Sequence, residues 1–342
     1  MSTDHFGRIG GVRRRRMIAT ATLAVSLGSL MGASSVLAAP RGIFSVYEQC
    51  PASVPGVALC QYAEITSGEF AIGSMRVPID REIVLQGGAV HTGGENPNEY
   101  FEVPATNGAS ISKTELEIPG GLSTLIDCDA IKGGGFPGEL RRGACRAFFG
   151  HRRMGASVIV EPAASVSNPV IEDLAALALG EGVGVVFPIR LHLKNPLLGD
   201  ACYIGSEASP IELHLTDGTT DPPAPAVPIK GNAGKSRSEV EEGFETVTTT
   251  DNTLVDNDFS VPVAEGCGGN PHFSSIVDEL LDQTLGLESG PGRNTAILTG
   301  THRVARPAGV LASEQFPENN PPPPPPPPHH RHHHQHRWWP AH

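Results

Sequence analysis

The sequence predicts a mostly β protein with an antiparallel, sandwich-like architecture of two related halves, two short helices and a disordered C-terminal tail. The first observation is alternation within 188–217. P-I-R-L-H-L-K-N at 188–195 and P-I-E-L-H-L-T-D at 210–217 both place apolar residues at every second position. A period of two residues is typical of a half-buried strand.

The second observation is internal repetition. I-G-S-x-x-x-P-I occurs at 72–79 and again at 204–211, with C-Y-I-G-S at 202–206 between the two alternating segments. N-x-Y-F-x-V-P at 98–104 is matched loosely by N-D-F-S-V-P at 257–262, which we interpret as a second F-x-V-P strand. Two short matches in the same order favour an ancient duplication. We therefore assign a first β-rich half to 39–165, a helical connector to 166–182 and a second half to 183–312.

The elements are expected in the following order. In the first half, strand-like sequence covers 43–88, and shorter strands are predicted at 101–104, 114–118 and 158–160. A helix capped by Asn168 then covers 169–179, and a long strand covers 183–193. A Pro-rich exposed loop at 221–245, a helix at 275–285 and a final strand at 295–304 follow. Gly180 and Gly286 follow the two helices, as expected for helix C-termini.

Residues 1–38 have the pattern of a signal peptide. A basic stretch at 13–16 precedes an apolar run at 17–37, and small residues precede a predicted cut after Ala38. The alternative is a transmembrane anchor, which the Gly and Ser interruptions of the run disfavour. Arg15 and Arg16 leave open whether export follows the twin-arginine route. We expect a secreted or cell-envelope protein with no stable membrane anchor after cleavage.

The charge of the remaining chain is strongly negative. The whole sequence has a formal net charge of −12, and removal of the five arginines and one aspartate of residues 1–38 changes this to −16. Such a field repels phosphate backbones and anionic lipid, so nucleic acid is not an expected partner.

Six cysteines follow the predicted cut, and an even number in an exported chain favours disulfides. Six cysteines allow 15 connectivities. Our prediction joins nearest neighbours: Cys50 with Cys60, Cys128 with Cys145, and Cys202 with Cys267. A zinc site is the alternative, but the spacing contains no C-x-x-C.

The C-terminal tail, 313–342, has a biased composition. Eight prolines at 321–328 precede a histidine-rich end, and the prolines predict a polyproline II rod. Flexible imidazoles can bind Zn, Ni or Cu weakly. The candidate ligands are His329, His330, His332, His333, His334 and His336. The competing interpretation is a low-complexity tail without a defined role, and no other cofactor is predicted.

Other polar residues give weak chemical signals. His192 and His214 occupy equivalent places in the two alternating segments and are expected on the solvent side of the sheet, separated by a strand that contains I-G-S. Ser110 and Lys113 resemble the first part of an acyl-serine motif, but the other parts are missing. The acidic groups at 239–242 and 256–258 lack calcium-loop spacing and are interpreted as solvated loops. No catalytic residue is predicted.

P-L-L-G-D-A-C-Y-I-G-S at 196–206, G-C-G-G at 266–269 and N-T-A-I-L-T-G at 294–300 resemble a group of secreted actinobacterial proteins. The resemblance covers most of 44–305 and implies export and paired cysteines, with no assigned function. Our leading hypothesis is a non-enzymatic binding or structural module whose partner is an unidentified envelope or extracellular component. The alternative is a secreted hydrolase of cell-wall or polymeric substrates, which a pocket of convergent Asp, Glu and His would favour.

Overall fold

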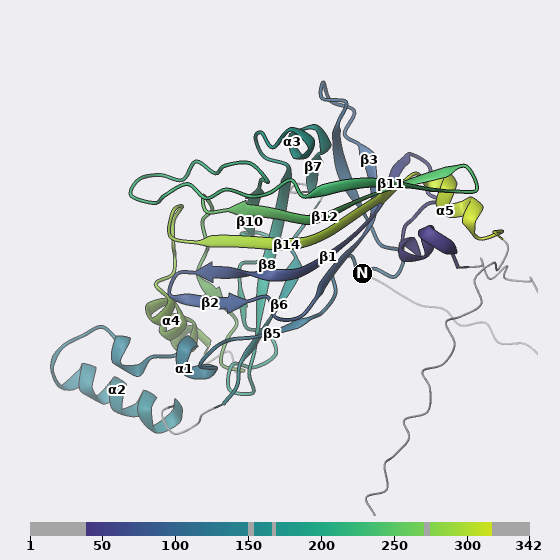
Figure 1. Ribbon diagram of the computed structural model, residues 1–342. Helices are drawn as coiled ribbons and strands as arrows, with labels where there is room; N and C mark the ends of the chain where they lie inside the picture. The colour runs from purple at the N-terminus through teal and green to yellow at the C-terminus, as the bar shows by residue number, and fades with distance from the viewer. Residues whose placement is uncertain (1–38, 150–153, 166–168, 270–273, 317–342) are drawn as a thin grey trace, which may run out of the picture. The chain divides into compact units, whose positions relative to one another are not determined.

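Antiparallel strands dominate the protein, which confirms the predicted mostly β class (Figure 1). The computed structural model describes residues 39–149, 154–165, 169–269 and 274–316. Its strands are β1 (Val57–Ile72), β2 (Met75–Pro78), β3 (Ile83–His91), β4 (Glu99–Pro104), β5 (Glu115–Glu117), β6 (Ser157–Pro162), β7 (Ile171–Asp173), β8 (Val185–Lys194), β9 (Tyr203–Ile204), β10 (Ile211–Leu215), β11 (Lys235–Glu241), β12 (Phe244–Asp256), β13 (Ala264–Glu265) and β14 (Thr295–Ala305).

Short helices accompany the sheet. They are the 3-10 helices η1 (Gly42–Tyr47) and η2 (Cys128–Ala130) and the α-helices α1 (Leu122–Leu125), α2 (Gly135–Phe149), α3 (Leu174–Leu179), α4 (Ser274–Leu285) and α5 (Pro307–Ser313). Among the described residues, no helix has the length and apolar content needed to cross a membrane.

The long strand β8 belongs to two parts of the sheet. Its first half pairs with β7 on one side and with β10 on the other, and its second half pairs with β6 and β9. The strand β1 also pairs with different strands along its length. Its first half pairs with β3 and its last four residues pair with β2, while β14 pairs with its other edge from Cys60 to Ala71. A register shift between Ile65 and Ser67 separates the two halves of β1, as expected where a bulge bends a strand.

Eight strands form a ring. The path runs through β12, β14, β1, β3, β4, β7, β8 and β10. Its ends are not joined by a continuous ladder. Instead, the Thr216 amide donates to the Val255 carbonyl at 3.0 Å and the Val255 amide donates to the Thr216 carbonyl at 2.8 Å. The Asp256 carboxylate, 1% exposed, also accepts from the His214 amide at 2.6 Å. These bonds connect β10 to β12.

The main hydrophobic core lies beside this ring, around the second halves of β1 and β8. Leu191, Leu193 and Ile204 are buried there, and α4 adds Val277, Leu281 and Leu285 from successive turns of one face. A smaller cluster on the other side of β1 joins Phe44 and Tyr47 of η1 to Phe316. The main core extends into the ring, because it also includes Phe187, Leu215 and Leu298.

Three disulfides join Cys50 to Cys60, Cys128 to Cys145, and Cys202 to Cys267. All three predicted pairs are therefore confirmed. The last bond connects the segment before β9 to the segment after β13, and these two short strands also pair with each other. The carboxylate of Asp278 on α4 accepts from the Cys267 amide at 2.8 Å.

Several expected elements differ from the structure. The helix predicted at 169–179 begins only at Leu174, because Ile171–Asp173 pairs with β4 and β8 as β7. Asp173, and not Asn168, caps this helix by accepting from the Ala175 and Ala176 amides at 2.9 and 3.0 Å; Asn168 lies outside the described residues. The connector at 166–182 thus contains a strand of the ring as well as a helix.

The predicted loop at 221–245 contains β11, which pairs with β12. Apolar periodicity does not mark this strand, since most of its residues are exposed. The second F-x-V-P segment, 257–262, is no strand and forms only a bridge between Val261 and Ser289.

The I-G-S segment does not separate the two alternating strands, because β10 pairs directly with β8. Both I-G-S copies do form a strand end followed by a turn, in which Gly73 and Gly205 have positive φ angles of 53° and 82°. The duplication itself stays a prediction.

Candidate functional site

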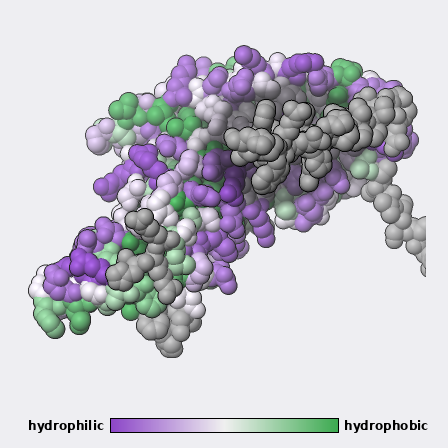
Figure 2. Space-filling view, turned by 60° about the horizontal axis from the view of Figure 1, so that its bottom comes forward, coloured by the Kyte–Doolittle hydropathy of each residue, from purple (hydrophilic) through white to green (hydrophobic). Residues whose placement is uncertain are grey.

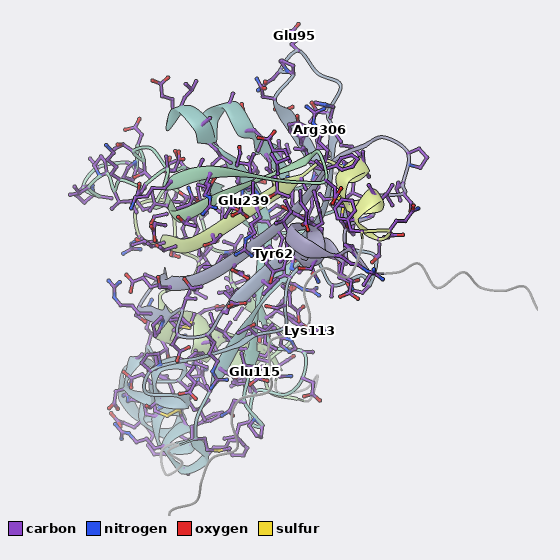
Figure 3. The ribbon with its side chains drawn as sticks, turned by 45° about the vertical axis from the view of Figure 1, so that its right-hand side comes forward. Tyr62, Glu95, Lys113, Glu115, Glu239 and Arg306 are labelled. Carbon is purple, nitrogen blue, oxygen red and sulfur yellow. A yellow bond between two sulfur atoms is a disulfide. The ribbon has the colours of Figure 1, made fainter. Side chains whose placement is uncertain are left out.

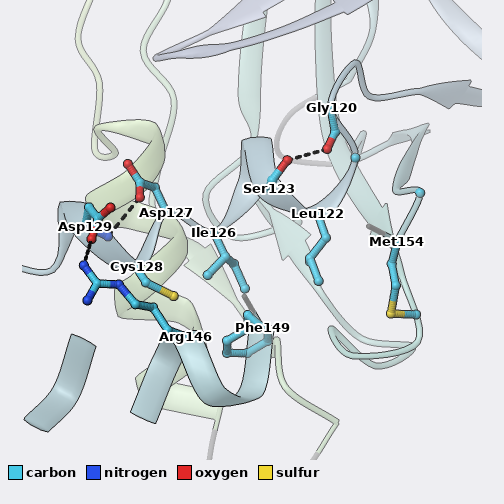
Figure 4. Close-up of a pocket in the computed structure, with 12 residues that line it drawn as sticks. Gly120, Leu122, Ser123, Ile126, Asp127, Cys128, Asp129, Arg146, Phe149 and Met154 are labelled. Carbon is cyan, nitrogen blue, oxygen red and sulfur yellow. Dashed lines mark hydrogen bonds and ion pairs between the residues drawn. The ribbon is translucent and has the colours of Figure 1, made fainter. Parts of the chain in front are cut away.

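Two hollows among the described residues are large enough for a small ligand. The first is an open pocket of about 650 Å³ between α1, η2 and α2 (Figure 4). Its polar groups are already paired: Arg146 binds Asp129, Asp127 accepts from the Asp129 amide at 2.9 Å, and the Ser123 hydroxyl donates to the Gly120 carbonyl at 2.6 Å. Residues 150–153, which connect two of its walls, are outside the described residues.

The α-helix beside that pocket carries an exposed apolar face. Phe136, Leu140 and Phe148 of α2 are 81, 63 and 64% exposed. Figure 2 shows hydrophobic residues gathered in separate patches on a mainly hydrophilic surface. Nothing in the structure shows what covers the face of α2.

The second hollow is a cavity of about 560 Å³ within the ring of eight strands. This volume lies in the range typical of small-molecule sites. Alternate residues of β8, β12 and β14 and of much of β1 face it, as the pleat predicts. The apolar lining includes Ala63 and Ile65 of β1, Leu85 of β3, Val185 and Phe187 of β8, Leu215 of β10, Val247 and Leu254 of β12, and Leu298 and Val304 of β14, with Leu174 and Leu177 of α3.

Polar side chains also line the cavity. They are Gln61 and Glu64 on β1, Gln86 on β3, Glu102 on β4, Glu172 on β7, Asp217 after β10, Ser236 on β11, Thr249 and Asn252 on β12, and Thr301 and His302 on β14. Gln61 donates a hydrogen bond from its amide to the carboxylate of Glu172. In the pairing of β4 with β7, Tyr100 lies opposite Glu172, and the Glu102 amide donates to the Val170 carbonyl. Glu102 and Glu172 are therefore diagonal neighbours on paired strands.

Glu102 and Glu172 are half-buried among the strands that surround the cavity. Burial raises the pKa of Glu172 to about 7; the hydrogen bond from Gln61 opposes this shift, and the negative charge of Glu102 adds to it. Burial also raises the pKa of Glu102, opposed by a hydrogen bond with Ser110. These shifts follow from the cost of holding a charge away from water.

Asp217 differs from the two glutamates because its carboxylate has no partner. The residue is 4% exposed, and neither carboxylate oxygen has a hydrogen-bond partner on any other described residue. Burial raises the pKa of Asp217, and a hydrogen bond from its own backbone amide opposes this shift. The residue lies against Gly231 and near Gly180, the glycine that ends α3. A buried polar group without a partner is costly, which makes this position a candidate for ligand binding.

His302 supplies no positive charge to the cavity. Burial lowers its pKa to about 4, so its imidazole is neutral at physiological pH. No lysine or arginine is among the described residues that line the cavity. Glu64, which also borders it, is paired with Arg303 at 3.5 Å. The unpaired charge of the cavity is therefore negative.

The histidines that the alternating segments suggested lie outside this cavity. His192 is 8% exposed and not on an open surface as expected, because Tyr203 stacks on its ring at 4.3 Å. Its Nδ1 contacts the Glu161 carboxylate at 3.1 Å and its Nε2 contacts the Asp200 carbonyl at 2.9 Å. With both ring nitrogens occupied, His192 is structural. His214 is partly exposed and contacts Glu212 at 3.0 Å.

The other weak signals also have structural explanations. The Ser110 hydroxyl accepts from the Ala105 amide at 3.1 Å, so it is engaged in a turn. The 256–258 segment is not a solvated loop, since Asp256 is buried and bonded as described above. The described residues contain no cluster of three or more metal-binding side chains. The six candidate histidines of the tail lie beyond residue 316, outside the described residues.

Figure 3 labels side chains that lie outside the cavity. Glu95 points outward at the tip of the connection between β3 and β4, and Tyr62 lies on β1. Tyr62 alternates with the cavity-lining Gln61 and Ala63 and has the Arg303 guanidinium 5.9 Å from its ring. One face of β1 therefore lines the cavity while the other supports Tyr62 and Arg303.

Sequence reasoning missed the whole cavity. Its polar residues come from separate strands, and no motif connects them. One signal was present: Gln61 and His302 occupy positions within strands where the alternation places apolar residues. Comparison with family models, with curated proteins and with solved structures finds no match to this chain. Its function is therefore inferred from the geometry of the cavity.

Proposed function

We propose that this protein is an exported, disulfide-stabilised binding module that holds a small, mainly apolar molecule inside its ring of strands. The observation that carries the proposal is the cavity of about 560 Å³, whose lining combines many aliphatic side chains with polar groups from several strands. Sites for small ligands commonly have this composition. Three disulfides and the predicted signal peptide support a role outside the cytoplasm.

Titration with the neutral fluorescent probe N-phenyl-1-naphthylamine tests this proposal. We expect saturable binding with one probe per protein. Ala63 faces the cavity from the middle of β1, so Ala63→Phe fills part of the space and should weaken probe binding at least tenfold. Ala63→Ser is the matched control, because it changes the same position with little added volume. Probe binding that is absent, or that is equal in both variants, would show that the cavity is not the binding site.

One observation favours hydrolysis as a second function. A carboxylic acid with a pKa near 7 beside another carboxylate is a common arrangement for general acid catalysis, and Glu172 with Glu102 has these properties. Release of p-nitrophenol from glycoside and ester substrates tests this function. Activity that Glu172→Gln abolishes and the surface control Glu95→Gln retains would support a hydrolase. Equal release by both variants and by buffer would exclude Glu172 as its acid for these substrates.

A further inference from the structure

The charge of the cavity restricts the ligand that it can hold. Glu102, Glu172 and Asp217 all face it, and the described lining residues include neither lysine nor arginine. His302 adds no positive charge at neutral pH. A ligand with a carboxylate or phosphate would bring a further negative charge into an enclosed acidic space with nothing to neutralise it, so anionic ligands such as fatty acids are disfavoured.

The three acids are not equivalent. Glu172 accepts a hydrogen bond from Gln61, and Glu102 interacts with Ser110. Asp217 has neither kind of contact, although it is 4% exposed and lines the same cavity. Native proteins rarely leave both oxygens of a buried carboxylate unpaired. The missing partner is therefore expected to come from outside the chain, and a group that donates hydrogen bonds and carries positive charge matches the carboxylate best.

Apolar residues surround this position. Leu215 precedes Asp217 by two residues on the same face, and Leu177 of α3 and Leu254 of β12 line the same cavity. A ligand that reaches Asp217 therefore contacts aliphatic walls over most of its length.

We propose that the cavity binds an amine-bearing amphiphile, with its ammonium group at Asp217 and its hydrocarbon part against the aliphatic walls. This inference rests on the proposed binding function and specifies its ligand class. An ammonium group placed there gains a charge-assisted hydrogen bond in a site shielded from water.

The test is displacement of N-phenyl-1-naphthylamine from the full mature protein at pH 7.5 by three ligands of equal chain length: decylamine, 1-decanol and decanoate. Decylamine is expected to displace the probe at a concentration at least tenfold below that of 1-decanol, with decanoate the weakest. Asp217→Asn keeps the size of the side chain and should reduce the affinity for decylamine to that for 1-decanol, without changing the affinity for 1-decanol. Asp221→Asn, an exposed position four residues later, is the control and should behave as wild type.

The outcomes separate the two proposals. Equal displacement by decylamine and 1-decanol, or strongest displacement by decanoate, would overturn the amine assignment while leaving a binding cavity. Failure of the wild-type protein to bind the probe would overturn both. The comparison among the three ligands uses only the wild-type protein, so it decides the matter even if Asp217→Asn does not fold.

Discussion

Replacement of Glu172 by glutamine should remove a specific part of the pH dependence of stability. In the folded protein the Glu172 side chain is enclosed within the ring, where burial raises its pKa from 4.5 to about 7. Glutamine has a similar shape and no charge, and its amide oxygen can still accept the hydrogen bond that Gln61 donates to Glu172. The substitution therefore removes the titration while preserving the packing.

The sign follows from proton linkage. Because the folded state holds the Glu172 proton more tightly than the unfolded state, the free energy of unfolding falls as pH rises from 4.5 towards 7 and levels off above that. The rise of the Glu172 pKa from 4.5 to about 7 lowers the free energy of unfolding by about 3 kcal/mol across the full titration. About 2 kcal/mol of this change falls between pH 5 and pH 8.

Urea unfolding at pH 5, 6, 7 and 8, with the disulfides intact, measures this effect. Other buried acids such as Asp256 and Asp282 have raised pKa values of the same sign, so the wild-type slope contains several contributions. The difference in pH dependence between wild type and Glu172→Gln isolates the contribution of Glu172. Glu95→Gln controls for the loss of a surface carboxylate. We expect the variant to gain about 2 kcal/mol over wild type between pH 5 and pH 8. Equal slopes for the two proteins would refute the claim that burial in the folded protein raises the pKa of Glu172.

Three further perturbations test the framework around the cavity. Asp256→Ala leaves the amides of His214 and Asp258 without their acceptor and should lower the free energy of unfolding by about 2 kcal/mol in urea. Asp221→Ala at an exposed position is the control, and an unchanged midpoint for Asp256→Ala would contradict the closure of β10 on β12. Joint replacement of Cys202 and Cys267 by alanine opens a loop of 65 residues and should lower the free energy of unfolding by about 4 kcal/mol. Thiol titration of denatured wild type should find no free thiol, and two or more free thiols would disprove the pairing. Leu191→Ala, at a side chain that is 1% exposed, should cost about 3 kcal/mol by leaving a void in the core, whereas a cost below about 1 kcal/mol would show that β8 is not central to it.

Local patterns in the sequence predicted much of the sheet. The alternation of Phe187, Ile189 and Leu191 predicted β8, and the same reasoning placed β14 and the helix α4 close to their observed bounds. Nearest-neighbour pairing of the six cysteines was also correct. These features depend on short stretches of chain, where periodicity and spacing carry the information.

The features that failed depend on contacts between distant segments. Ile171–Asp173 has three residues, too few for a visible period, and becomes a strand because β4 and β8 lie on either side of it. The junction between Thr216 and Val255 joins residues 39 positions apart through one bridge, for which the sequence contains no signal. The cavity exists only because this junction brings the two ends of the ring together, so its polar residues could not be grouped in advance.

A crystal structure of the protein with a bromine-tagged alkylamine tests the central claim most directly, because the anomalous signal distinguishes the bromine from protein and solvent atoms. The ring of strands and the unpaired Asp217 predict the bromine among the aliphatic walls of the cavity and the amine nitrogen about 3 Å from the Asp217 carboxylate. A bromine bound at the pocket beside α2 or on the surface, with the cavity empty or filled by the protein's own side chains, would contradict it.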